Sequence, residues 1–194
     1  MANNLPAGFV EGFVADADPS QPLAPGWIDR AFADPTPPAT LYHFTAREYL
    51  DAIMAEGLTK GEVPMDPNVI FGAVWLTSSR APSGHGLGRG KVLTVAEKRV
   101  MGVPDHANAR MPNKEAIRIE VDTEGLTVVP WMPWARRYLD PSWMGTLHRA
   151  AAENGPKRHK TWFMVAHPIP VASFRAVVDL AAKATLYTRP SSDA

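Results

Sequence analysis

Proline is the feature that most limits the folds open to this chain. The 194 residues include 19 prolines, about twice the average proline content of roughly 5%. A proline inside a helix costs about 3 kcal/mol, because its nitrogen has no hydrogen to donate and its ring clashes with the preceding turn. We therefore expect short helices and strands with irregular connections, not a regular helical bundle. The six tryptophans still indicate a folded core, because disordered chains contain few aromatic residues.

Charge and cysteine content exclude several classes of function. The 20 Lys and Arg residues balance the 20 Asp and Glu residues, so only a local basic patch could attract nucleic acid or an anionic membrane. The chain has no cysteine, which excludes a disulfide partner, a thiolate nucleophile and a cysteine-based zinc site. The histidines lack metal-ligand spacing, so we expect no metal. No signal peptide or membrane-spanning stretch is visible, so we expect a cytoplasmic protein without a membrane partner.

The sequence predicts one domain with two terminal extensions. Residues 1–39 contain seven prolines with aromatic residues between them, which favours an arm that packs on the domain and has a short helix near residues 26–32. A flexible tail is the alternative interpretation. Residues 40–188 then form the single domain, and residues 189–194 form a frayed tail.

The local patterns predict an α+β domain. Residues 40–44 favour a strand, followed by a helix with Thr45 and Glu48 as its capping box and Gly57 at its end. Asp140 and Pro141 predict the start of a second helix over residues 141–154. The prolines and glycines predict loops around residues 64–67 and 83–90, and mostly loop from there to residue 112. Residues 130–134 contain two prolines and are not expected to lie inside a helix. Further strands are predicted at residues 73–77, 116–121, 126–129, 161–166, 173–180 and 186–187. We expect a mostly antiparallel or split sheet.

Several polar residues are candidates for a functional site. Alternation along the first strand places His43 and Thr45 on one face, beside the helix start, where backbone N–H groups favour an anionic or polar ligand. A structural histidine and a capping threonine are the alternative. His85 lies in the glycine-rich loop over residues 83–90, which is either mobile or tightly turned. The basic run at residues 157–160 is either a solvated loop or a phosphate contact.

Arg118 and Glu120 form a second candidate pair. Ile117, Ile119 and Val121 alternate with them and must face the core, because a slip of one residue would bury both charges. The opposite face is then either solvent, where the ion pair contributes little, or the floor of a cleft. In a cleft, Arg118 would bind a nucleotide phosphate and Glu120 would supply an acid.

Three short motifs give the chain a resemblance to a known family. The run Leu-Tyr-His-Phe-Thr at residues 41–45, the Glu-Gly-Leu at 56–58 and the Val-Trp-Leu-Thr at 74–77 resemble the N-terminal half of ADP-ribosyltransferase-like proteins. Small hypothetical proteins of bacteria and phages are similar in the same blocks. The match is better over residues 40–80 than over 116–180. The resemblance implies a split antiparallel sheet, NAD as the substrate, and transfer of ADP-ribose to a macromolecular acceptor, which makes the protein a glycosyltransferase.

The resemblance also implies roles for individual residues. His43 would hydrogen-bond a ribose hydroxyl of NAD with Thr45 beside it, and Trp75 or Tyr49 would cover the nicotinamide, unless Trp75 is simply a core residue. The nucleotide-binding set would be completed by Thr77, His85 and Arg118.

The sequence departs from the family pattern at one position. Active members often begin a late strand with a glutamate, whereas this strand begins with Lys160, Thr161 and Trp162. Glu120 is then the candidate catalytic acid, together with His43. The family's RNA 2′-phosphotransferases lack that glutamate and use several basic residues, for which this chain offers Arg80, Arg89, Arg118, Arg136 and Arg137. A non-catalytic phage or mobile-element protein that sequesters a nucleotide or a host protein is the alternative function.

Overall fold

The computed structural model describes residues 32–59, 61–66, 69–100, 102–153 and 155–190. Within these residues, seven strands form one antiparallel sheet in the order β6-β7-β4-β1-β5-β8-β9. Two further strands, β2 and β3, pair with each other. The strands span Thr40–Thr45 (β1), Glu62–Asp66 (β2), Val69–Gly72 (β3), Val74–Thr77 (β4), Ile117–Asp122 (β5), Val129–Pro130 (β6), Trp162–Val165 (β7), Phe174–Asp179 (β8) and Ala184–Thr188 (β9). The expected α+β class with a mostly antiparallel sheet is confirmed.

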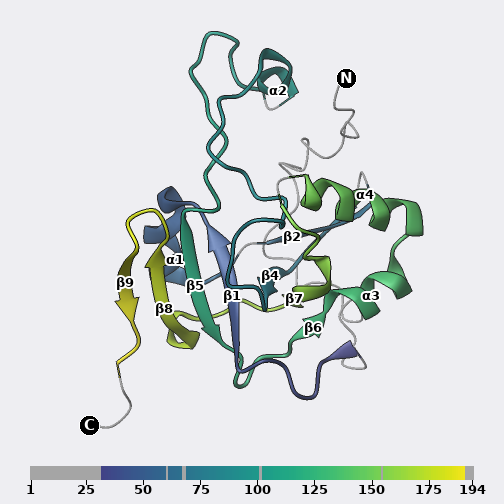
Figure 1. Ribbon diagram of the computed structural model, residues 1–194, viewed down its shortest axis with the longest axis vertical. Coiled ribbons are helices and arrows are strands. Elements are labelled where there is room, and N and C mark those ends of the chain that lie inside the picture. Colours follow the sequence, from purple (N-terminus) through teal and green to yellow (C-terminus); the bar gives the residue numbers. More distant parts are fainter. Residues whose placement is uncertain (1–31, 60, 67–68, 101, 154, 191–194) are drawn as a thin grey trace.

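Short helices cover both faces of this sheet (Figure 1). Helix α1 follows β1 and packs on one face, while α3 and α4 pack on the other. The helices span Leu50–Glu56 (α1), Val95–Val100 (α2), Trp131–Tyr138 (α3) and Pro141–Ala152 (α4), with 3-10 turns at Arg47–Tyr49 (η3), His159–Thr161 (η4) and Val171–Ser173 (η5). No helix in the described part of the chain is long and apolar enough to cross a membrane.

The two faces of the sheet carry different cores. The α1 side is aliphatic and includes Leu41, Ile117 and Ile119, all fully buried. The α3 and α4 side is aromatic, with Trp131 and Trp134 fully buried at its centre. The alternation predicted for residues 116–121 therefore sends its apolar side chains to the α1 side, as expected.

One weakly paired position divides the sheet into two halves. In the described part of the chain, β1 and β4 share a single registered pair, Tyr42 with Thr77, whereas β1 pairs with β5 along its full length and β4 does so with β7. The halves β6-β7-β4 and β1-β5-β8-β9 thus meet at one seam between β1 and β4.

Several predicted elements differ from those observed. Thr45 is the last residue of β1 and does not cap a helix, because Ala46 is the N-cap of η3 and no side chain caps it. Helix α3 includes Pro133, although no helix interior was expected there. The proline lies in the first turn, where backbone N–H groups have no partner within the helix. Of residues 126–129, only Val129 is in a strand. Strand β2 and helix α2 occupy stretches predicted as loop, and β3 was not predicted.

Residues 89–113 form a long extension of the domain. It leaves the body as two crossing chain segments that carry α2 near their far end (Figure 1). Single bridges join Arg89 to Asn113 and Val92 to Arg110. The extension adds little to the hydrophobic core, because Leu93 is the only buried apolar side chain among its described residues. No periodic pattern in the sequence marks this extension, because its contacts are local turns, single bridges and ion pairs.

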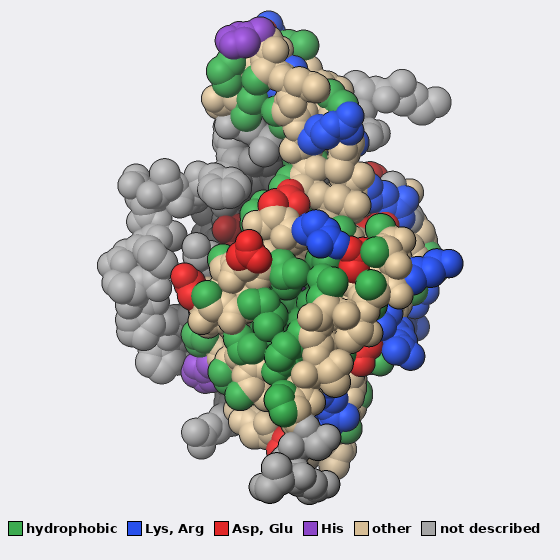
Figure 2. All heavy atoms as spheres, turned by 90° about the vertical axis from the view of Figure 1, so that its left-hand side faces the viewer, with side chains coloured by type: hydrophobic (Ala, Val, Ile, Leu, Met, Phe, Trp, Pro, Cys, Tyr) green, Lys and Arg blue, Asp and Glu red, His purple; other side chains and the backbone are tan. Residues whose placement is uncertain are grey.

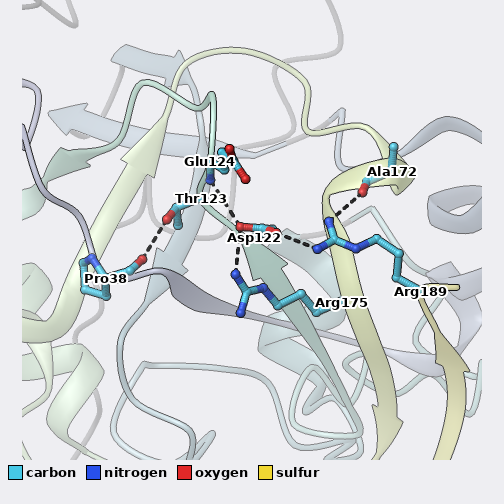
Figure 3. Close-up of polar contacts among 7 residues, drawn as sticks. All are labelled: Pro38, Asp122, Thr123, Glu124, Ala172, Arg175 and Arg189. Atoms are coloured by element: carbon cyan, nitrogen blue, oxygen red, sulfur yellow. Dashed lines mark hydrogen bonds and ion pairs between the residues drawn. The ribbon is translucent and has the colours of Figure 1, made fainter. Parts of the chain in front are cut away.

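A buried carboxylate ties the end of β5 to its neighbours. Asp122 accepts hydrogen bonds from Arg175 and Arg189, at 3.0 and 2.7 Å (Figure 3). The Arg175 bond, helped by Arg189, lowers the pKa of Asp122 to about 2 despite burial. The hydroxyl of Thr123 donates to the carbonyl of Pro38 at 2.8 Å, so residues next to β1 are held against the domain. Residues 1–31 of the predicted arm, and residues 191–194 of the predicted tail, lie outside the described residues.

The outer face of β8, β9 and α1 is partly apolar. Figure 2 shows hydrophobic side chains gathered in the middle of this face and Lys and Arg side chains along one margin. The exposed apolar residues of these elements include Tyr49 of η3 and Leu186 of β9. An exposed tyrosine on η3 does not pack in the core, whereas Trp75 does, so the two residues proposed to cover a nicotinamide differ in environment.

Candidate functional site

His43 lies at the seam between β1 and β4. Its Nδ1 atom is 2.9 Å from the backbone carbonyl oxygen of Trp75. A carbonyl oxygen only accepts, so Nδ1 carries the hydrogen and donates it, and Nε2 of the neutral ring has a free lone pair. Burial lowers the pKa of His43, with a smaller contribution from the charge of Lys114, while the bond to Trp75 opposes the shift. Nε2 has no hydrogen-bond partner among the described residues, so the partly buried ring keeps one unused acceptor.

The sheet separates the predicted site residues into two groups. The register pairs His43 with Ile119 and Thr45 with Ile117, and paired residues project from the same face. His43 and Thr45 therefore lie on the α1 side, where Thr45 is buried. The other predicted site residues on strands project from the opposite face, on the α3 and α4 side; these are Trp75, Thr77, Arg118 and Glu120.

Arg118 and Glu120 form a pair that is mostly covered by protein. Nη2 of Arg118 donates to Glu120 at 2.9 Å, and their side chains are 12% and 18% exposed. The exposed Arg80 reaches the same carboxylate oxygen of Glu120 at 3.3 Å. The Arg118 guanidinium also lies 5.6 Å from the ring centre of Tyr42. The low exposure of both side chains disfavours the interpretation of Arg118 and Glu120 as a fully solvated ion pair.

A polar cluster lies next to this pair, at the end of β4. The hydroxyls of Thr77 and Thr161 are 2.7 Å apart, so the last residue of η4, directly before β7, contacts a predicted site residue. The hydroxyl of Ser79 accepts a hydrogen bond from Nη1 of Arg158 at 2.7 Å. Thr161 and Ser79 had no recognisable signal in the sequence. Arg158 belongs to the basic run at residues 157–160, which was the signal available for this part of the site.

Trp75 is part of an aromatic core. Its ring centre is 4.9 Å from that of Trp131 and 5.5 Å from that of Trp162. Its indole Nε1 donates to the carbonyl of Glu62 at 2.6 Å. These contacts favour the core interpretation of Trp75 over a ring that covers a ligand.

Two histidines each accept a hydrogen bond from a tryptophan side chain. The indole N–H of Trp162 donates to Nδ1 of His85, and that of Trp131 donates to Nε2 of His148, both at 2.8 Å. Burial lowers the pKa of each histidine to about 4, assisted for His85 by the charge of Arg158 and opposed by its bond to Ala81. His85 also stacks on Phe44 at 5.7 Å. It therefore lies beside the face that carries Arg118 and Glu120.

The glycine-rich loop around His85 is tightly docked. Gly84 has a φ of +83°, and a Cβ atom there would overlap the carbonyl oxygen of Pro156. Gly86 has a φ of +70° and lies against Ala151 of α4. This packing favours a tightly turned loop over residues 83–90, not a mobile one. The described residues contain no group of three or more His, Cys, Asp or Glu side chains placed to hold a metal ion.

Comparison with known proteins adds no relative. No protein-family model matches the chain, and neither a curated protein nor a solved structure matches it. The site must therefore be interpreted from its own geometry.

Proposed function

We propose that this protein is an ADP-ribosyltransferase-like enzyme that binds NAD or a related nucleotide and transfers ADP-ribose to a macromolecular acceptor. The observation that carries the proposal is the bond between His43 and Trp75 at the seam of the sheet. It fixes the imidazole at the position where the two halves of the sheet are least connected, and it leaves Nε2 as a hydrogen-bond acceptor. A ribose hydroxyl is a suitable donor for that atom.

The reaction requires more than a ribose contact. Cleavage of the bond between nicotinamide and ribose develops positive charge on the sugar, which an acid must stabilise. Glu120, the acid that we propose for this role, projects from the face of the sheet opposite His43, so the two side chains cannot contact the same ribose directly. Two arginines already engage the carboxylate of Glu120, and their charges weaken the stabilisation that it can give to a cationic sugar. We therefore expect slow turnover.

A non-catalytic nucleotide-binding protein on the same scaffold is the second candidate function. It is favoured by Thr161, a neutral residue near the position where active members of the family that the sequence resembles carry a glutamate. A binding protein of phage or mobile-element origin needs the ribose contact of His43 but no acid. Its effect would be to sequester a nucleotide or a host protein.

One experiment separates the two functions. The purified protein is incubated with NAD, and released nicotinamide is quantified while a parallel sample is melted with and without NAD. An enzyme releases nicotinamide in proportion to protein concentration. A binding protein shows a higher melting temperature with NAD and no release, because a ligand of the native state stabilises it by RT ln(1 + [L]/Kd). If NAD causes neither effect, both candidates are wrong for this nucleotide.

A further inference from the structure

The aromatic side of the sheet carries an unbalanced group of cations beside the end of β4. We define the arginine cluster as Arg80, Arg118 and Arg158, together with the exposed Lys157 and Lys160 that flank Arg158. We propose that the arginine cluster is a binding site for a phosphate group carried by a nucleotide or a nucleic acid. Its role in transfer rests on the proposed function, whereas phosphate binding does not.

Two arginines converge on one short turn of the chain. Nη1 of Arg158 donates to the hydroxyl of Ser79 at 2.7 Å, and Nη1 of Arg118 lies 3.4 Å from the carbonyl oxygen of Arg80. Ser79 and Arg80 are adjacent, so the two guanidinium groups lie close to the same turn. This turn is fixed by a bond from the Ser79 amide to the hydroxyl of Thr77 at 3.0 Å. A fixed turn presents both groups in a defined arrangement.

The protein satisfies these guanidinium groups only in part. The Nε atoms of Arg118 and Arg158 are buried without a hydrogen-bond partner among the described residues. Arg158 has a neutral hydroxyl as its partner and no ion pair within the described residues. A half-buried arginine is normally paired with a carboxylate or a phosphate. The buried Nε atoms are themselves closed to an outside ligand, but the lack of an anionic partner for the half-buried Arg158 among the described residues favours an anion that comes from outside the chain.

The charges of the arginine cluster point to the same conclusion. Its five cations share one carboxylate in the described part of the chain, that of Glu120, which contacts Arg80 and Arg118. Four positive charges remain in excess, although the whole chain has a formal net charge of zero. The positive field reaches His85, whose pKa is lowered in part by Arg158. A phosphate group matches this field and the planar donors of arginine.

Binding of three phosphate probes tests the inference. The full chain is titrated with inorganic pyrophosphate, with NAD, and with an eight-nucleotide single-stranded RNA at fixed ionic strength. Arg158→Gln is compared with Arg99→Gln, which removes the same charge from an exposed side chain of α2 in the extension. The Lys157→Gln, Lys160→Gln double variant alters no bond to Ser79, so it keeps the test valid if Arg158→Gln folds poorly.

The expected result is a loss of affinity of about tenfold or more for at least one probe in Arg158→Gln, since charge-assisted contacts are roughly twice as strong as neutral ones. A smaller loss is expected in the double variant, and a change of less than about twofold in Arg99→Gln. Loss confined to NAD identifies a nucleotide site, and loss for the RNA identifies an acceptor site. Equal affinity of the parent and all variants, or no binding of any probe, would overturn the inference.

The outcome is independent of the proposed function. If RNA or pyrophosphate binding depends on Arg158 while NAD is neither bound nor cleaved, the phosphate site stands and the proposed function fails. If NAD is cleaved and no affinity depends on Arg158, the proposed function stands and the phosphate site fails.

Discussion

The imidazole of His43 and the carbonyl of Trp75 are joined by a 2.9 Å hydrogen bond across the seam between β1 and β4. The side chain of His43 therefore links two strands that share one registered backbone pair in the described residues. The same bond fixes the tautomer, so that Nδ1 is the donor and Nε2 the free acceptor. One residue thus combines a structural contact with the proposed contact to a ribose hydroxyl.

These two roles of His43 can be separated by substitution. His43→Ala removes both nitrogens and leaves the Trp75 carbonyl without its partner, which should lower the free energy of unfolding by about 1–3 kcal/mol. His43→Asn places an amide N–H near the position of Nδ1, so most of this stability should return. Urea denaturation of both variants measures the difference. Equal stability of the two variants and the parent would show that the bond to Trp75 does not contribute to stability.

The tryptophan-bound histidines predict sensitivity to acid. In the unfolded chain, His85 and His148 bind protons near pH 6.5, whereas in the folded chain they do so near pH 4. The unfolded state therefore binds more protons between these values, and stability should fall as the pH is lowered from about 6.5 to 4. Melting temperatures measured across this range by tryptophan fluorescence provide the test.

A variant assigns this pH dependence to its source. His148→Gln keeps an acceptor for the indole N–H of Trp131 but does not titrate, so its melting temperature should change less with pH than that of the parent. A pH profile that is unchanged by the substitution would place the sensitivity elsewhere.

Removal of the Glu120 charge should have opposite effects on stability and on anion binding. Glu120→Gln leaves Arg118 and Arg80 without their carboxylate, so the free energy of unfolding should fall by about 1–3 kcal/mol. The arginine cluster then gains one net positive charge, and pyrophosphate should bind more tightly. Weaker pyrophosphate binding by a folded Glu120→Gln protein would contradict the arrangement that we describe.

The docked glycine loop predicts a large effect of a small substitution. Gly84→Ala adds a Cβ atom that overlaps the Pro156 carbonyl oxygen, at a positive φ that is already unfavourable for alanine. Gly102→Ala is the matched control, because Gly102 has a φ of +64° with open space around it. We expect a larger fall in melting temperature for Gly84→Ala. Similar melting temperatures for both variants would mean that residues 83–90 do not pack as the structure has them.

The sequence predicted most strands of the seven-stranded sheet and the start of α4, because their signals are local, but it missed β2 and β3. Alternating apolar residues identified β5, and Asp140 with Pro141 marked the start of α4, where the Asp140 carboxylate accepts bonds from Ser142 and Trp143. Thr45 and Pro133 were misinterpreted because each has a second common use. Threonine favours strands as well as caps, and proline is tolerated in a first helical turn.

The candidate site was less predictable, because it depends on strand register and on contacts far apart in the chain. Alternation placed His43 and Thr45 on one face, but it could not relate that face to Arg118, which is set by the pairing of β1 with β5. The contacts of Thr77 with Thr161 and of Ser79 with Arg158 join residues that are about 80 positions apart. No local pattern encodes such contacts.

The most direct test of the proposed function is the affinity of His43→Asn for NAD, measured by calorimetry beside the parent protein. The substitution should preserve the bond to Trp75 and remove the free acceptor at Nε2. The account predicts that the parent binds NAD, and that His43→Asn binds it about tenfold more weakly or worse while its melting temperature stays close to that of the parent. Equal NAD affinity of the two proteins, or no binding by the parent, would contradict the role of His43 as a nucleotide ligand.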